Sequence, residues 1–227
     1  MKRVCVVCEG QTEEIFVRDV LAPSLHSAGL NLLPEMVEHS PGRKGGALVY
    51  DRVKRHIRNT LRQSSAPIVT TLIDLYRLDV AFPGFGAAAG KIDLRTRLQT
   101  LTDALHADIV TYAECRPERF IPYIQPYEFE ALLFSDIDTL VAFETSWQHA
   151  KAKLGAARAA AKSPEHINDG PTTKPAARLE SDLRNPSFRK TLHGPRIAQR
   201  IGLPRIEAEC AFFAGWLSKL REVAASS

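Results

Sequence analysis

The chain has 227 residues, a length that corresponds to one large domain or one and a half. Hydrophobic residues make up 44% and charged residues 25%, which is an ordinary globular composition and excludes wholesale disorder. Thirty Lys and Arg against 26 Asp and Glu give a net charge of +4, a mild basic excess that permits nucleic-acid binding without requiring it.

The apolar runs of the chain fall short of the roughly 20 residues that cross a bilayer. The first of them is also too short for the apolar core of a signal peptide. We therefore expect a soluble, cytoplasmic protein with no membrane partner.

Residues 2–8 form a continuous apolar run, which predicts a central parallel strand buried on both faces. Thr12 is expected to cap the following helix, whose first turn carries Glu13 and Glu14. Further strands are predicted at 30–37, 68–73, 107–114 and 120–124, and helices at 48–62 and 92–105. This alternation favours an α/β fold with a mostly parallel sheet.

After Pro126 the pattern becomes helical, with Gly, Pro and Asn in the connections. Helices are expected at 128–134, 137–143, 148–162, 176–183, 186–200 and 206–223. We therefore predict a sheet domain over residues 1–125 and a helical C-terminal extension over 126–227 that packs on the cleft. An exposed apolar stripe on these helices would indicate a homodimer.

Cys5 and Cys8 form a C-x-x-C pattern, which invites a zinc or redox interpretation. Residues three apart in a strand point to opposite faces, so these two thiols are not expected to share a metal. Cys115 and Cys210 have no cysteine or histidine at ligand spacing. All four cysteines are predicted to be small core residues.

Two carboxylates follow predicted strands directly, Glu9 after the first and Asp74 after the third. Carboxyl ends of parallel strands meet at one sheet edge, where ligands bind, so these side chains should converge. Glu13 lies one helical turn from Glu9 and can face the same crevice. Oxygen ligands suit Mg²⁺ or Mn²⁺, which polarise a phosphodiester and activate water. Alternatively, Glu13 and Glu14 only complement the helix dipole.

Three further acidic residues are candidate ligands. Asp79 would be either a ligand or a loop-capping residue. Glu128 and Glu130 flank Phe129; if this segment is extended, both face one side and can reach the crevice. If it is helical, the two side chains diverge and one lies on the surface.

Basic residues suggest phosphate contacts at two places. Arg43 and Lys44 lie in a glycine-rich loop that would hold a phosphate or form a solvated turn. The loop lacks Walker A spacing, so no NTPase is predicted. Lys174 belongs to a second basic set that would track a nucleic-acid backbone or simply be surface, together with Arg189, Lys190, Arg196 and Arg200. Aromatic residues after Asp74 would stack on bases or pack the loop, namely Tyr76, Phe82 and Phe85.

Residues 6–14, V-V-C-E-G-Q-T-E-E, resemble the first motif of the Toprim superfamily, and more closely its OLD-type nucleases. Residues 71–76 stand where Toprim proteins carry a strand-end D-x-D. Residues 74–84, 126–134 and 172–176 resemble one Toprim-like family of formerly unknown function. That family includes the nuclease effector of the PARIS anti-phage system, which works beside an ABC-type ATPase.

The resemblance implies roles for individual residues. Glu9 would be a metal ligand or general acid/base, Glu13 a second ligand, and Asp74 the first Asp of D-x-D. Tyr76 replaces the usual second Asp, and a phenol does not replace a carboxylate on Mg²⁺ at neutral pH. One-metal and two-metal mechanisms therefore both stay open.

The expected function is a metal-dependent Toprim-type endonuclease that hydrolyses phosphodiester bonds, with RNA, including tRNA, ahead of DNA. The resemblance implies an anti-phage defence role controlled by an ATPase partner. The alternative is a catalytically weak Toprim-fold module that docks to such an ATPase. A weaker third hypothesis is a phosphohydrolase acting on small nucleotides.

Overall fold

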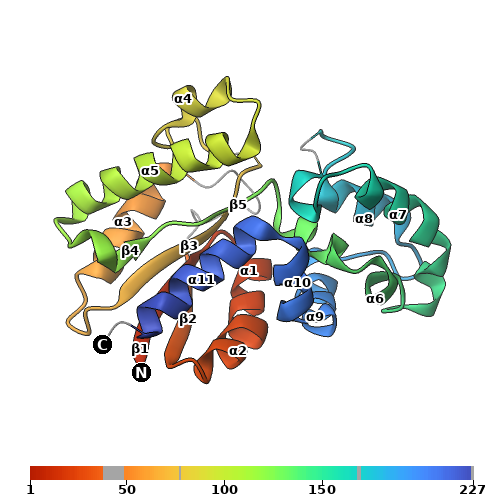
Figure 1. Cartoon of the computed structure of the whole chain (residues 1–227), viewed down its shortest axis with the longest axis horizontal. Helices are drawn as coiled ribbons and strands as arrows, with labels where there is room; N and C mark the ends of the chain where they lie inside the picture. The colour runs from red at the N-terminus through yellow and green to blue at the C-terminus, as the bar shows by residue number, and fades with distance from the viewer. Residues whose placement is uncertain (38–48, 77, 168–169, 226–227) are drawn as a thin grey trace, which may run out of the picture.

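The computed structural model describes residues 1–37, 49–76, 78–167 and 170–225. Within them the chain forms an α/β fold, with helices on both faces of a parallel sheet and a helical lobe beside it (Figure 1). The predicted fold class is confirmed. None of the described helices is both long enough and apolar enough to cross a bilayer.

The sheet is built around two adjacent strands, β1 (Lys2–Cys8) and β3 (Ile68–Asp74). β2 (Leu30–Met36) lies outside β1, and β4 (Phe120–Ile121) and β5 (Ile124–Gln125) both pair with β3. Every pairing is parallel, so the strands end at one common edge. The predicted strands at 2–8, 30–37 and 68–73 are confirmed, and the one at 120–124 forms two short pieces.

Side chains of β1 alternate between two hydrophobic cores, one on each face of the sheet. Val4, Val6 and Cys8 belong to one core, and Cys5 and Val7 belong to the other. The prediction that Cys5 and Cys8 point to opposite faces is therefore confirmed. All four cysteines are free thiols.

One face of the sheet is covered by α3 (Tyr50–Leu61) and α5 (Leu94–Ala113), and α4 (Phe85–Ala89) packs on α5 (Figure 1). The strand predicted at 107–114 is wrong, because α5 continues through those residues. Ile109 and Ala113 keep the helical spacing that buries Leu98 and Leu105. This amphipathic periodicity overrides the local β-branched composition.

The other face is covered by α1 (Gln11–Phe16), a π-helical turn η1 (Val17–Leu21), α2 (Ala22–His26) and the last helix, α11 (Ala211–Ala225) (Figure 1). In α11, Trp216 Nε1 donates a hydrogen bond to Thr70 Oγ1 of β3, at 2.8 Å. The last helix of the C-terminal region therefore forms a layer on the sheet.

The start of α1 differs from the prediction for Thr12. The N-cap position is Gly10, and no side chain caps the helix there. Thr12 lies inside the first turn and is buried. The predicted capping role of Thr12 is therefore wrong.

The helical lobe contains η3 (Phe129–Ser135), α6 (Ile137–Val141), η4 (Thr145–Ala150), α7 (Lys151–Ala159), η5 (Pro164–His166), α8 (Pro175–Asp182), α9 (Lys190–Ile201) and α10 (Leu203–Glu209). A short 3₁₀ turn, η2 (Pro117–Arg119), precedes β4. Trp147 is fully buried in the lobe and donates from Nε1 to the carbonyl of Pro186, at 2.8 Å. The large hydrophobic side chains that are exposed in the described parts of the chain lie outside the C-terminal helices, at Met1, Met36, Val49, Val80 and Ile92.

Candidate functional site

Glu9 and Asp74 meet at the carboxyl edge of the sheet. β1 and β3 are adjacent and parallel, so their ends lie side by side. Glu9 Oε2 accepts the backbone N–H of Asp74 at 3.0 Å, and the Glu9 N–H donates to the carbonyl of Leu72. The structure thus brings together the two strand-end carboxylates.

Glu13 faces the same place from the first turn of α1, and only 7% of it is exposed. A Cβ added to Gly10 would lie 3.3 Å from Glu13 Oε2, so the glycine leaves room for this carboxylate. Glu14 instead pairs with Arg18 at 3.0 Å, near the surface. The two glutamates therefore separate: Glu13 belongs to the cluster, and Glu14 does not.

The segment after β5 is attached to the end of β3. Asp74 Oδ1 accepts the backbone N–H of Phe129 at 2.9 Å. The N–H groups of Leu75 and Tyr76 donate to the carbonyls of Gln125 and Tyr127. These contacts hold residues 125–129 beside Asp74 and bring two further carboxylates to the site.

Those carboxylates are Glu128 and Glu130, each 2% exposed. Glu128 is extended (φ −144°, ψ 153°), whereas Glu130 lies in the first turn of η3. Neither of the two predicted geometries holds for the whole segment, yet both side chains point to one ammonium group. Lys190 Nζ lies 3.8 Å from Glu128 Oε1 and 3.6 Å from Glu130 Oε1.

Lys174 also reaches this cluster. Its ammonium group forms an ion pair with Glu128 Oε1, and Glu128 Oε2 accepts the N–H of Ala176 at 3.0 Å. The same Nζ lies 4.1 Å from the ring centroid of Tyr76, a cation–π contact. Tyr76 thus lies against a lysine.

Glu13, Glu128 and Glu130 are buried, Glu9 and Asp74 are half-buried, and the cluster carries an excess of negative charge. Burial, with a smaller contribution from neighbouring carboxylates, raises the pKa of Glu9, Glu13 and Glu130 to about 7 each. Burial and the same neighbours raise the pKa of Asp74 well above its usual range. Burial lowers the pKa of Lys190, but Glu130 and Glu128 outweigh this effect and place it above the ordinary lysine value. An additional cation would relieve this repulsion.

The remaining candidates lie elsewhere. Asp79 Oδ2 accepts the N–H of Tyr50 at 2.8 Å and Oδ1 that of Ala81 at 3.0 Å, so this carboxylate ties its loop to the start of α3. Phe82 is buried and packs its ring against Tyr50, at 5.2 Å between centroids. Arg43 and Lys44 lie outside the described residues.

Sequence reasoning placed Lys190 only in a general basic set and missed its contact with Glu128 and Glu130. The residue reaches them because α9 packs closely on α1 and η3. A Cβ added to Gly194 would lie 3.2 Å from the Phe129 ring and 3.4 Å from Thr12 Cγ2. A glycine inside an amphipathic helix was the available signal of this close approach.

The fold and the site together define an α/β protein whose parallel strands end in a carboxylate–lysine cluster. Residues 8–221 match the family described as a domain of unknown function (DUF4276), and the chain belongs to that family. Neither a curated protein nor a solved structure matches the chain.

Proposed function

We propose that the chain is a metal-dependent phosphodiester hydrolase that acts on nucleic acid, with RNA as the first substrate to test. One observation carries this proposal: three carboxylates converge where β1 and β3 end, beside two lysines. The carboxylates are Glu9, Glu13 and Asp74, and the lysines are Lys174 and Lys190. The carboxylates would bind a cation and the lysines an anionic group, so the site suits an anionic substrate that binds together with a metal ion.

The donor set fits Mg²⁺ or Mn²⁺ by its chemistry, since every candidate ligand is a carboxylate oxygen. It is not preassembled, because the described residues contain no group of three or more His, Cys, Asp or Glu arranged to hold a metal. Glu9, Glu13 and Asp74 are the residues that would hold the ion. When bound, it would polarise a phosphoryl oxygen and lower the pKa of water.

The protein's own groups would do the remaining work. Lys174 and Lys190 carry fixed positive charge next to the cluster, where a phosphate oxygen would be stabilised. Glu9 has a pKa of about 7 without the ion, so metal binding would displace a proton from the cluster near neutral pH. Its Oε2 accepts the Asp74 N–H, which orients the carboxylate at the end of β1.

The wider biological role rests on the motif resemblance. The resemblance of residues 74–84, 126–134 and 172–176 to the Toprim-like family that includes the PARIS nuclease effector supports an anti-phage defence role in the cytoplasm, under control of an ABC-type ATPase partner. Because both RNA and DNA carry the phosphodiester that the site would act on, the two substrates are to be compared directly.

The test is a calorimetric titration with Mn²⁺ and a cleavage assay on RNA, single-stranded DNA and duplex DNA. We expect the wild type to bind the metal and cleave at least one substrate. Glu9→Gln and Asp74→Asn should lose binding and at least about 100-fold in cleavage rate, as removal of a charged catalytic group does. Glu14→Gln is the matched control, because Glu14 pairs with Arg18 near the surface, outside the cluster.

A second candidate is a catalytically weak binding or regulatory module that docks to an ATPase. The ion pairs of Lys174 and Lys190 favour it, because they already neutralise Glu128 and Glu130. Two results together would contradict the hydrolase and favour the binding module. The wild type would fail to bind Mn²⁺ at millimolar concentration, and any cleavage would be unchanged in Asp74→Asn.

A further inference from the structure

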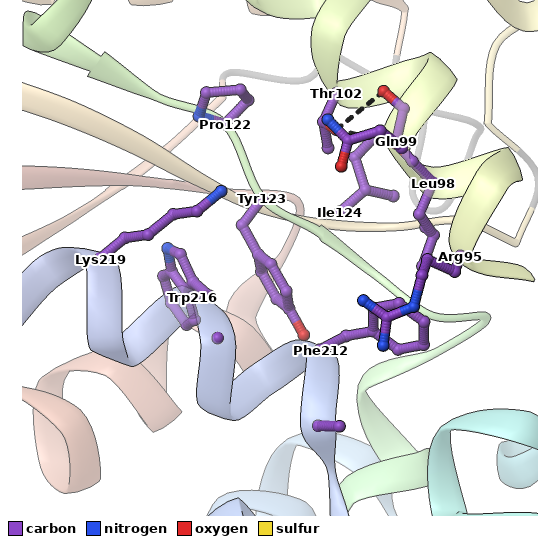
Figure 2. A pocket seen from close by; sticks show the side chains of 12 residues that line it. Arg95, Leu98, Gln99, Thr102, Pro122, Tyr123, Ile124, Phe212, Trp216 and Lys219 are labelled. Atoms are coloured by element: carbon purple, nitrogen blue, oxygen red, sulfur yellow. Dashed lines mark hydrogen bonds between the residues drawn. The ribbon is translucent and has the colours of Figure 1, made fainter.

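A cavity lies between α5, residues 122–124 and α11, and no residue of the carboxylate cluster lines it (Figure 2). Its volume is about 220 Å³. The side chains that give it chemical character are Arg95, Gln99, Tyr123, Phe212, Trp216 and Lys219. It is large enough for one small ring system with a substituent, and too small for most drug-sized ligands, whose pockets measure about 300–1,000 Å³.

Two aromatic rings form a preformed wall of this cavity. Tyr123 and Trp216 stack with centroids 4.5 Å apart and planes 6° apart. Their polar atoms are already satisfied inside the protein. Trp216 Nε1 donates to Thr70 Oγ1, and the Tyr123 hydroxyl donates to Gln125 Oε1, both at 2.8 Å. Only 6% of Tyr123 and 2% of Trp216 is exposed, so the pair forms a rigid apolar wall that presents a small area to an occupant.

Two cations border the same cavity. Figure 2 shows Lys219 and Arg95 on opposite sides, with the Tyr123 and Trp216 rings between them. The Arg95 guanidinium lies 5.3 Å from the centroid of the Phe212 ring. Among the described residues that line the cavity, none is acidic. The cavity therefore combines apolar walls with positive charge that no lining carboxylate neutralises.

We propose that this cavity binds the planar ring of a ligand that carries a phosphate, such as a nucleoside monophosphate, with the phosphate at the border of the cavity. The ring would lie against the apolar wall, and Lys219 would hold the phosphate by charge-assisted hydrogen bonds, while Arg95 on the opposite side would attract the anion at longer range. This inference does not rest on the proposed hydrolase activity. Binding here uses no residue of the carboxylate cluster and needs no metal.

Gly215 allows the cavity to be filled without disturbing the fold. It lies on α11 at the cavity wall, and a Cβ added there meets no atom within 4 Å. Gly215→Leu should therefore occupy the cavity. Gly155 of α7 provides the matched control, since it is also a helical glycine with no atom within 4 Å of an added Cβ. Both variants gain the same helix propensity.

The experiment is a titration of intrinsic tryptophan fluorescence with adenosine and uridine monophosphates in the presence of EDTA. We expect at least one nucleotide to change the Trp216 emission of wild type and Gly155→Leu with the same affinity. Gly215→Leu should bind at least about tenfold more weakly, and Lys219→Gln about tenfold more weakly through loss of one charged contact. Adenosine and inorganic phosphate alone should each bind more weakly than the intact nucleotide.

Three results would overturn the proposal. The first is no response of the wild type to either nucleotide at about 5 mM, a concentration that detects even weak binding. The second is equal binding to Gly215→Leu and Gly155→Leu, which would place the nucleotide elsewhere. The third is unchanged nucleotide affinity in both Lys219→Gln and Arg95→Gln, which would show that neither cation binds the phosphate.

Discussion

The protein buries carboxylates in two regions, and they are stabilised differently. Glu165 of the helical lobe is fully buried, and its two oxygens accept the N–H groups of Phe212 and Phe213, each at 2.9 Å. It thereby caps the first turn of α11. At the sheet edge, Glu9, Glu13 and Asp74 lie close enough to repel one another, with Glu13 buried and Glu9 and Asp74 half-buried. Burial raises the pKa of both Glu165 and Glu9 to about 7, so a raised pKa does not by itself identify a functional site. Like-charged neighbours do distinguish the cluster.

The largest expected effect of a substitution is on stability, at Glu165. Glu165→Ala should lower the free energy of unfolding by about 2–4 kcal/mol, because two buried N–H groups lose their acceptor. Urea unfolding followed by circular dichroism measures it. Metal binding at the sheet edge should be unchanged. A loss below about 0.5 kcal/mol would show that Glu165 is not the cap that the structure indicates.

The buried carboxylates of both regions should contribute to the pH dependence of the free energy of unfolding. The pKa of Glu9, Glu13, Glu130 and Glu165 is about 7 in the folded protein, against 4.5 ordinarily. The folded state then binds more protons than the unfolded state between these values, so stability should fall as pH rises from 4.5 to 7 and level off above. Urea unfolding across this range measures the fall. About 10 mM Mg²⁺ should restore part of it at pH 8 if the cluster binds the ion.

Glu35 should have the opposite dependence, at lower pH. Hydrogen bonds from His56 and Thr60 lower its pKa to about 2. Its contribution is present above pH 4.5 and is lost as pH falls through 2. Glu35→Gln should therefore flatten the acid limb of the stability profile and leave the limb between pH 4.5 and 7 as in the wild type. A change confined to that upper limb would contradict this assignment.

A smaller effect separates Glu13 from its neighbour. Glu13→Gln should raise the free energy of unfolding at pH 8 by about 1 kcal/mol, because a buried charge among like charges is removed. The same change should weaken Mn²⁺ binding. Glu14→Gln, near the surface beside Arg18, should do neither. Equal behaviour of the two variants would mean that Glu13 only complements the dipole of α1.

The smallest effect is expected at Gly10. In Gly10→Ala the new Cβ would lie 3.3 Å from Glu13 Oε2, so the carboxylate must shift by a few tenths of an ångström. Stability should change by less than about 1 kcal/mol, whereas calorimetry should show weaker Mn²⁺ binding. Gly90→Ala, where an added Cβ meets nothing within 4 Å, is the matched control.

Much of this arrangement was predictable, because strand ends are local features. The apolar runs that form β1 and β3 each stop at an acidic residue, and parallel pairing then fixes the meeting of Glu9 and Asp74. The reach of Lys190 was not predictable, since it depends on how α9 packs against η3. Residues 107–114 were assigned to a strand because their β-branched content outweighed the longer periodicity of α5.

The contact between Trp216 and Thr70 joins two residues that are 146 positions apart in the chain. α11 completes a face of the sheet that it shares with α1, η1 and α2. Part of this apolar face therefore stays open until the two distant segments have met, and open apolar surfaces are prone to aggregation during folding.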